Sequence, residues 1–402
     1  MTLAALIAAY HDSADAGDGL RATLPLAGRP LVERQARLAA SAGARPIVVV
    51  ADRQPRELLA SVGRLRADGL DVLLALSPAE AARAVQADDR ILLVGDGILA
   101  GEGDVARLVA ADGPALLTVP DSQYDDRFER IDAESRWAGL GIVSGELLKK
   151  TVEMLQDWDL QSTLLRRAVQ SGARQLAIGG DPPGVHLLAA EKAADLDALQ
   201  SRMIEHSGGH QSDWVSRYLL APLEQAAIRR LMSTQISANQ LWLAGLCLGA
   251  VSALGFSRGW LWTGLVLFLL STPLAGAAER LGRLQMDLAG HQTWFGRLVP
   301  LIAASALLAL AYALWPLQGW GTMVLAVCAI AFLAALDGEV RREPSRTHVF
   351  LAEPKGMAWL LLPFAAAGQW VAGLGALALY AAGSFFWVQR FEHPRKDAGH
   401  QN

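Results

Sequence analysis

The chain has 402 residues, which is enough for two domains. Its net charge of −4 gives no basis for nucleic-acid binding, and its only two cysteines, Cys247 and Cys328, argue against both a disulfide framework and a thiolate metal site. Charged residues are dense up to Arg230 and sparse after it, so a polar domain followed by a membrane-embedded one is expected.

The first part of the chain alternates short apolar runs with segments of helical spacing. The apolar runs predict strands at Leu3–Ala9, Pro46–Val50, Val72–Leu76 and Ile91–Val94. The helical spacing predicts helices at Pro30–Ala42, Pro55–Ala67 and Pro78–Val85. This rhythm is typical of a Rossmann-like α/β fold, a parallel sheet with helices on both faces, in which ligands bind beyond the carboxyl ends of the strands.

Two glycine-containing loops follow predicted strands. Gly17 and Gly19 precede Arg21, so backbone amides and a guanidinium could approach a phosphate there, although Gly-x-Gly in a loop is more often an ordinary turn. Asp96 lies in a Gly-Asp-Gly turn, where its carboxylate could hold Mg²⁺ or Mn²⁺ against nucleotide phosphates or be a plain turn residue. The candidate nucleotide-binding residues are therefore Gly17, Gly19, Arg21 and Asp96, with Asp96 also the candidate metal ligand.

Together these features resemble the sugar-nucleotide type of nucleotidyltransferase. The opening strand, the loop 16–21, the segment 24–31 and the Asp96 turn stand in that family's order, and the resemblance covers roughly residues 1–195. It implies a nucleotide partner such as CTP and a divalent cation. The family also carries a lysine after its glycine loop, whereas this chain has none before Lys149, and a nearby arginine is not an equivalent point charge.

Residues 196–236 form a predicted linker that contains an amphipathic stretch, Asp213–Arg230. With Trp and Leu on one side and Arg on the other, just before a membrane span, this stretch is expected to lie in the membrane interface. His206 and His210 flank two glycines in the same linker, either as a metal-binding pair or as solvated loop residues.

Residues 237–392 contain apolar runs long enough to cross a bilayer. Six spans are predicted, at Leu241–Phe256, Trp260–Ala278, Leu298–Trp315, Gly321–Leu336, and twice within Met357–Val388, with a break near Gly368–Gly375. The alternative is a set of buried helices in a soluble protein. The predicted fold is thus an α/β nucleotidyltransferase domain followed by an all-α six-helix transmembrane domain.

The loop charges favour the membrane interpretation. Basic residues gather in alternate loops and in the tail 393–402, whereas Arg258 is the only one in the other loops. Because cytoplasmic loops collect Lys and Arg, the amino-terminal domain and the tail are predicted to be cytoplasmic, in the inner membrane of a bacterium.

The residues before the first span, Arg217-Tyr218, Arg229-Arg230 and 236–240, resemble the entrance of the CDP-alcohol phosphatidyltransferase family. That resemblance implies six spans and the displacement of CMP from a CDP-alcohol by a second alcohol. A nucleotidyltransferase fused to such a block is the arrangement of the bifunctional inositol-phosphate cytidylyltransferase and di-inositol-phosphate synthase proteins.

The family's signature, Asp-x-x-Asp-Gly-x-x-Ala-Arg followed by Gly-x-x-x-Asp-x-x-x-Asp, holds two divalent ions and a catalytic base. Here its first two aspartates fall on Thr272 and Ala275, which cannot replace carboxylate ligands. The second pair falls on further uncharged residues. The remnants of the signature are Gly276, Glu279, Arg280 and Gly296.

Two functions remain open. The first is a catalytically silent relative, a pseudoenzyme that binds or scaffolds in membrane phospholipid synthesis, as a homodimer or in a hetero-complex with an active relative. The second is an active transferase that releases CMP, with metal ligands rebuilt from Glu279, Asp287, Asp337 and Glu339. The segment 337–342 also looks like the signature, or is simply a charged loop. A transporter is disfavoured because the spans lack midplane charges.

Overall fold

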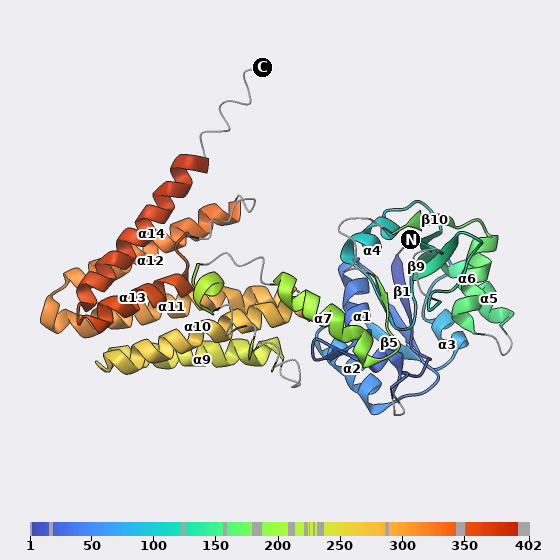
Figure 1. The fold of residues 1–402 in the computed structure, drawn as a ribbon, viewed down its shortest axis with the longest axis horizontal. Helices are drawn as coiled ribbons and strands as arrows, with labels where there is room; N and C mark the ends of the chain where they lie inside the picture. Colours follow the sequence, from blue (N-terminus) through green and yellow to red (C-terminus); the bar gives the residue numbers. More distant parts are fainter. Residues whose placement is uncertain are drawn as a thin grey trace, which may run out of the picture. The chain divides into compact units, whose positions relative to one another are not determined.

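The structure is a computed structural model that describes residues 2–15, 19–121, 126–155, 159–178, 187–207, 214–220, 224, 226–227, 230, 237–285, 289–342 and 350–392. The chain forms two compact units, Met1–Met203 and Ile204–Asn402. Figure 1 shows the first unit as a sheet covered by helices and the second as a bundle of helices.

The first unit is built on a seven-stranded sheet with the order β10-β8-β9-β6-β1-β4-β5. Its strands are β1 (Leu3–Ala8), β4 (Ile47–Val50), β5 (Val72–Ala75), β6 (Arg90–Val94), β8 (Ala115–Pro120), β9 (Ser135–Ser144) and β10 (Arg174–Ala177). The central strand β1 runs parallel to β4 and β6, and all three are apolar and buried, as strands covered on both faces must be.

The prediction of a parallel sheet is confirmed for the four predicted strands but not for the sheet as a whole. β9 runs antiparallel to both β6 and β8, so the sheet is mixed. Strand direction depends on how the connecting loops run, and the sequence pattern of β9 does not encode it. The four predicted strands themselves are confirmed to within two residues.

Helices cover both faces of this sheet. They are α1 (Leu31–Ser41), α2 (Arg56–Ala67), α3 (Pro78–Arg83), α4 (Glu102–Val109), α5 (Gly145–Glu153) and α6 (Leu160–Gln170), followed by α7 (Ala193–Ser207). In Figure 1, α1, α2 and α4 lie on one side of the strands and α3, α5 and α6 on the other. Ser77, Ser144 and Asp159 cap α3, α5 and α6 with side-chain oxygens, which fixes where these helices begin.

Two short ribbons shape the edge where ligands are expected. β2 (Pro25–Leu26) and β3 (Arg29–Pro30) form a tight hairpin that leads into α1. β7 (Ile98–Leu99) pairs with β11 (Leu188–Ala189), which returns the chain to the loop after β6. Residues almost a hundred positions apart in the sequence therefore meet at this edge.

The second unit consists of α9 (Ala238–Ser257), α10 (Leu261–Leu284), α11 (Ala289–Gln318), α12 (Gly321–Arg342), α13 (Pro354–Ala366) and α14 (Trp370–Glu392). Among the described residues, five helices are long and apolar enough to cross a membrane, namely α9, α10, α11, α12 and α14. These five helices are consistent with a multi-pass membrane protein.

The prediction of six full spans was wrong at the fifth. α13 has 13 residues, about 20 Å of helix, which is shorter than the bilayer core of about 30 Å. The apolar run does break where expected, since Gly368 adopts a left-handed φ of 73° between α13 and α14. The sequence showed the length of the apolar run Met357–Val388, but it did not show that the backbone before Pro354 is non-helical.

Small residues set the close packing of the first three helices. A Cβ on Gly249 of α9 would lie 2.5 Å from Ile302 of α11, and one on Gly255 would lie 3.3 Å from Gly264 of α10. The Ser252 hydroxyl donates to the Gly264 carbonyl at 2.7 Å. Small residues of this kind let helix backbones approach in membranes.

The two ends of the bundle differ in side chains. One end carries five tryptophans, namely Trp260, Trp262, Trp315, Trp320 and Trp370, and the rings of Trp262 and Trp370 meet at 5.8 Å. The other end carries the basic residues Arg283, Arg297, Lys355 and Arg390. We call these the tryptophan end and the basic end. Tryptophan belts of this kind are common at membrane surfaces.

The segment before α13 is extended, and α14 satisfies its backbone. The Tyr380 hydroxyl donates to the carbonyls of Phe350 and Leu351 at 3.1 and 3.0 Å, and the amide of Ala352 donates to the Ser384 hydroxyl at 3.0 Å. Non-helical backbone at membrane depth requires such partners within the protein.

The predicted interfacial stretch is described only in part. Ser216–Leu220 forms one wide helical turn in which Leu220 is buried while Tyr218 and Leu219 are exposed. The Tyr218 ring stacks on Phe350 at 6.5 Å. The predicted histidine pair of the linker is not placed, because His210 lies outside the described residues.

Candidate functional site

Asp96 lies at the carboxyl edge of the first unit's sheet, directly after β6, as predicted. Its carboxylate is buried, and Oδ2 accepts from the amides of Tyr10 and His11 at 2.8 and 2.7 Å. Those two residues follow β1, the neighbouring strand. The structure therefore brings the ends of β1 and β6 together at one carboxylate.

The Gly-Asp-Gly turn has a steric reason for its second glycine. Gly97 has a φ of 70°, and a Cβ there would lie 2.4 Å from the carbonyl oxygen of Ala190. The Gln161 side chain of α6 accepts from the Asp96 amide at 3.2 Å. The turn is thus held by α6 and by the segment after β11, with its carboxylate facing the end of β1.

His11 lies beside Asp96 and carries a positive charge there when it is protonated. Its Nδ1 lies 3.2 Å from Asp96 Oδ2, and this hydrogen bond raises the pKa of His11, while partial burial opposes the shift. Burial raises the pKa of Tyr10, reinforced by the negative charges of Asp159 and Asp96. The second carboxylate oxygen, Asp96 Oδ1, is buried and accepts no hydrogen bond from the described residues. One acceptor is therefore left for a ligand.

Arg21, the predicted phosphate partner, is engaged within the protein. Its Nη2 lies 2.8 Å from Glu191, which follows β11, and its Nε donates to the Asp12 carbonyl at 3.3 Å. The guanidinium therefore already has a carboxylate where a phosphate was expected.

The loop before Arg21 is also bonded internally. The Ser13 amide donates to the Gly19 carbonyl at 2.8 Å, the Ala14 amide to the Glu191 carbonyl at 2.8 Å, and the Asp15 amide to the Ser13 hydroxyl at 3.1 Å. Amides that serve these acceptors are not turned toward a phosphate. Gly17 lies outside the described residues.

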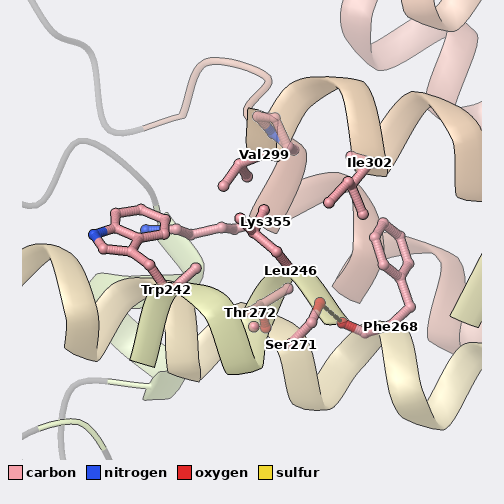
Figure 2. A pocket seen from close by; sticks show the side chains of 12 residues that line it. Trp242, Leu246, Phe268, Ser271, Thr272, Val299, Ile302 and Lys355 are labelled. Carbon is pink, nitrogen blue, oxygen red and sulfur yellow. Dashed lines mark hydrogen bonds between the residues drawn. The ribbon is translucent and has the colours of Figure 1, made fainter. Parts of the chain in front are cut away.

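In the second unit, the signature remnants lie on α10 and at the start of α11. Thr272, which the resemblance aligns with the first aspartate of the signature, accepts a hydrogen bond from the Trp359 indole of α13 at 2.9 Å. Thr272 and Ala275 line a hollow of about 30 Å³ together with Lys355 (Figure 2). The two positions that the resemblance aligns with aspartates therefore carry a hydroxyl and a methyl group, and they line the same hollow as Lys355.

Glu279 pairs with cations of the chain itself. Its carboxylate contacts Arg283 one turn later and lies 3.3 Å from the Lys355 ammonium. This carboxylate is therefore neutralised by two side chains, which disfavours its use as a metal ligand.

Glu224, a residue that sequence reasoning missed, gives Gly276 and Arg280 a structural role: it pairs with Arg280 and packs against Gly276. Arg280 Nε lies 3.1 Å from the Glu224 carboxylate, and both side chains are buried. A Cβ on Gly276 would lie 2.5 Å from Glu224 Oε1. Gly296, by contrast, has no atom within 4 Å of its Cβ position. The four remnants thus do not form one cluster in the structure.

No group of three or more His, Cys, Asp or Glu side chains that could hold a metal ion occurs in the described part of the chain. Asp287, one of the carboxylates proposed for a rebuilt site, lies outside it. The segment 337–342 is the end of helix α12 rather than a separate loop.

The other residues that sequence reasoning missed are His11, Lys355 and Trp359. His11, at the end of β1, contacts Asp96. Lys355 and Trp359, both on α13, contact Glu279 and Thr272 of α10. In each case the two partners are more than 70 positions apart in the sequence. Only the position of Lys355, the one lysine between Lys192 and the tail residue Lys396, could have drawn attention to it.

Comparisons with known proteins find likeness only in solved structures. No family profile and no curated protein matches the sequence. The inositol-1-phosphate CTP transferase from T. maritima is similar with 15% identity and a TM-score of 0.38, over 50% of this chain and 96% of its own. A putative glucose-1-phosphate thymidylyltransferase from Bacillus anthracis, in complex with a sucrose, is similar with 10% identity and a TM-score of 0.40, over 50% of this chain and 95% of its own. Both likenesses concern the amino-terminal half.

Proposed function

We propose that this chain is a catalytically silent relative of the CDP-alcohol phosphatidyltransferases, a binding or scaffold subunit of membrane phospholipid synthesis. One observation carries the proposal. Where the family's two-metal site requires aspartates, this chain has Thr272 bonded to Trp359, and Ala275 beside the hollow that Lys355 lines. An ammonium group repels the cations that such a site needs.

The first unit supports the same proposal. Asp96 Oδ2 is satisfied by two amides and His11, and Arg21 is held by Glu191. The unit has no lysine after the glycine loop to neutralise the leaving pyrophosphate, and the nearby Arg21 is paired with Glu191. It keeps one buried acceptor, Asp96 Oδ1, so binding of CTP without turnover is compatible with the geometry.

The proposed setting is the inner membrane of a bacterium, with the basic end and the amino-terminal unit on the cytoplasmic side. α13 and α14 are joined by a tight turn at Gly368, so the chain returns to the basic end after α14 even though α13 is short. A carboxyl-terminal reporter fusion active only in the cytoplasm tests this orientation, and activity only outside it would contradict it.

The decisive experiment measures CMP release by the purified full chain in detergent, with CDP-alcohols, acceptor alcohols and Mg²⁺ or Mn²⁺. No release above a protein-free control is expected, and calorimetry should show no metal-dependent binding of CDP-alcohols. Metal-dependent turnover that survives Lys355→Gln and is lost in Glu279→Gln would overturn the proposal in favour of an enzyme with rebuilt ligands. If the chain is a scaffold, its co-expression with an active relative should change the rate of CMP release by that relative or the amount of that relative in the membrane.

A further inference from the structure

Two hollows in the second unit meet at the first turn of α13. The smaller, of about 30 Å³, lies between α9, α10 and α11, and the larger, of about 350 Å³, lies between α10, α11, α12 and α13. Both are lined by Phe268, Ala303 and Pro354, so they are neighbours around the same residues. We call the two adjoining hollows together the path.

The smaller hollow presents hydrogen-bond donors. Among the residues that the structure describes, Lys355 is the only charged one that lines it, and its side chain is 16% exposed. Trp242 is 5% exposed, and its indole Nε1 has no hydrogen-bond partner among the described residues. Figure 2 shows the nitrogens of Trp242 and Lys355 at the same end of the pocket.

The start of α13 adds to this positive character. Pro354 occupies the first turn, and Glu353 at the N-cap makes no side-chain cap hydrogen bond. Uncapped first-turn amides carry the positive end of the helix dipole. Glu279 offsets only part of the charge, because Lys355 and Arg283 share its single carboxylate.

The larger hollow presents mainly apolar side chains. Leu301, Leu307, Ile330, Leu333 and Met357 line it, with Asp337 and Glu353 among its polar members. A cavity of this chemistry suits a hydrocarbon chain rather than a sugar or a nucleobase.

We propose that this path binds an anionic phospholipid without a divalent cation, with the phosphate at Lys355 and Trp242 and one acyl chain in the larger hollow. The proposal rests on the proposed binding role and names its ligand class. In it, the Lys355 ammonium does for the phosphate what metal ions do in an active transferase. A free phosphate has the same charge but leaves the apolar hollow empty, so the lipid is the better complement.

The test uses the full chain, delipidated in detergent, and native mass spectrometry with phosphatidylglycerol as the probe in EDTA. Binding is expected in EDTA and unchanged by added Mg²⁺. Lys355→Gln should weaken it by about 10- to 100-fold, as expected for a lost charge-assisted hydrogen bond. Lys355→Arg should weaken it less. Arg297→Gln, which removes an exposed charge at the same end, is the matched control and should leave affinity nearly unchanged.

Two further arms separate the sources of phosphate and guard against misfolding. Ala304→Phe, which fills the larger hollow, should weaken the binding of phosphatidylglycerol but not the binding of inorganic phosphate. Thermal unfolding checks that each variant is folded. The proposal is overturned if binding requires Mg²⁺, if phosphatidylcholine and phosphatidylglycerol bind equally, or if folded Lys355→Gln binds like the wild type.

Failure here and failure of the proposed function are distinguishable. If the protein releases CMP but still binds lipid in EDTA, the catalytically silent role is refuted and the lipid site stands. If the protein neither releases CMP nor binds lipid, the silent role stands and the lipid site is refuted.

Discussion

The Lys355 ammonium lies 3.3 Å from the Glu279 carboxylate, so the first turn of α13 is tied to the end of α10. Lys355 also lines the hollow that contains Thr272 and Ala275, the two positions that the proposed relationship aligns with metal-binding aspartates. Unlike a bound ion, a side-chain cation cannot be removed by a chelator. Chelation is therefore expected to leave the thermal stability of the protein unchanged.

Gly276→Ala is expected to destabilise the second unit by about 1–3 kcal/mol, because the new Cβ would meet Glu224 at 2.5 Å in a packed interior. Gly296→Ala is the matched control, since its Cβ meets no atom within 4 Å and alanine favours helix by about 1 kcal/mol. Thermal unfolding in detergent measures both. Equal effects of the two substitutions would contradict the structural explanation of Gly276.

Removing one partner of the Glu224–Arg280 pair leaves a buried charge without its counterion. Arg280→Met and Glu224→Leu are each expected to cost about 3–5 kcal/mol, whereas the double variant should recover most of that loss. Unfolding measured for all four proteins closes a double-mutant cycle. Additive losses would show that the two side chains do not depend on each other.

His11 should make the stability of the protein depend on pH. Because Asp96 raises the pKa of His11 in the folded state, the stabilisation is complete below the unfolded pKa of about 6.5 and is lost as the pH rises through the higher folded value. The melting temperature of His11→Gln should therefore lie below that of the wild type at pH 5.5 and match it at pH 9. Asp96→Asn should remove the same pH dependence, and a constant difference across this range would refute the pairing.

Glu191→Gln should release Arg21 for an anionic ligand. Tighter CTP binding by about two- to fivefold is expected, because a partly exposed ion pair is worth about 1 kcal/mol or less. Glu153→Gln removes an exposed charge of the same sign from α5 and is the control. If calorimetry gives the same CTP affinity for both variants, Glu191 does not compete with the nucleotide.

Local patterns were sufficient for β1, β4, β5, β6 and α1 to α3 in the first unit and for the five long apolar helices of the second. The apolar strand β4, four β-branched residues in a row, and the long apolar runs of α9 to α12 are visible in the sequence because burial depends on side-chain type. The reversed direction of β9 and the shortened α13 were not predicted. Both depend on connections and tertiary hydrogen bonds rather than on local composition.

The candidate sites were predicted in part. Asp96 lies at the predicted strand end, because the carboxyl edge of a parallel sheet follows from strand order. The partners that define what each site can do, namely His11, Glu191, Glu224, Lys355 and Trp359, come from other segments. A single sequence carries no signal for pairs such as Thr272 and Trp359, 87 positions apart.

The extended backbone before α13 has a consequence for biogenesis. Its polar groups find their partners, Tyr380 and Ser384, on the helix synthesised after it. Until α14 has been made, those groups lack the partners that they have in the folded protein. The start of α13 is therefore expected to reach its folded conformation only after translation has passed Ser384.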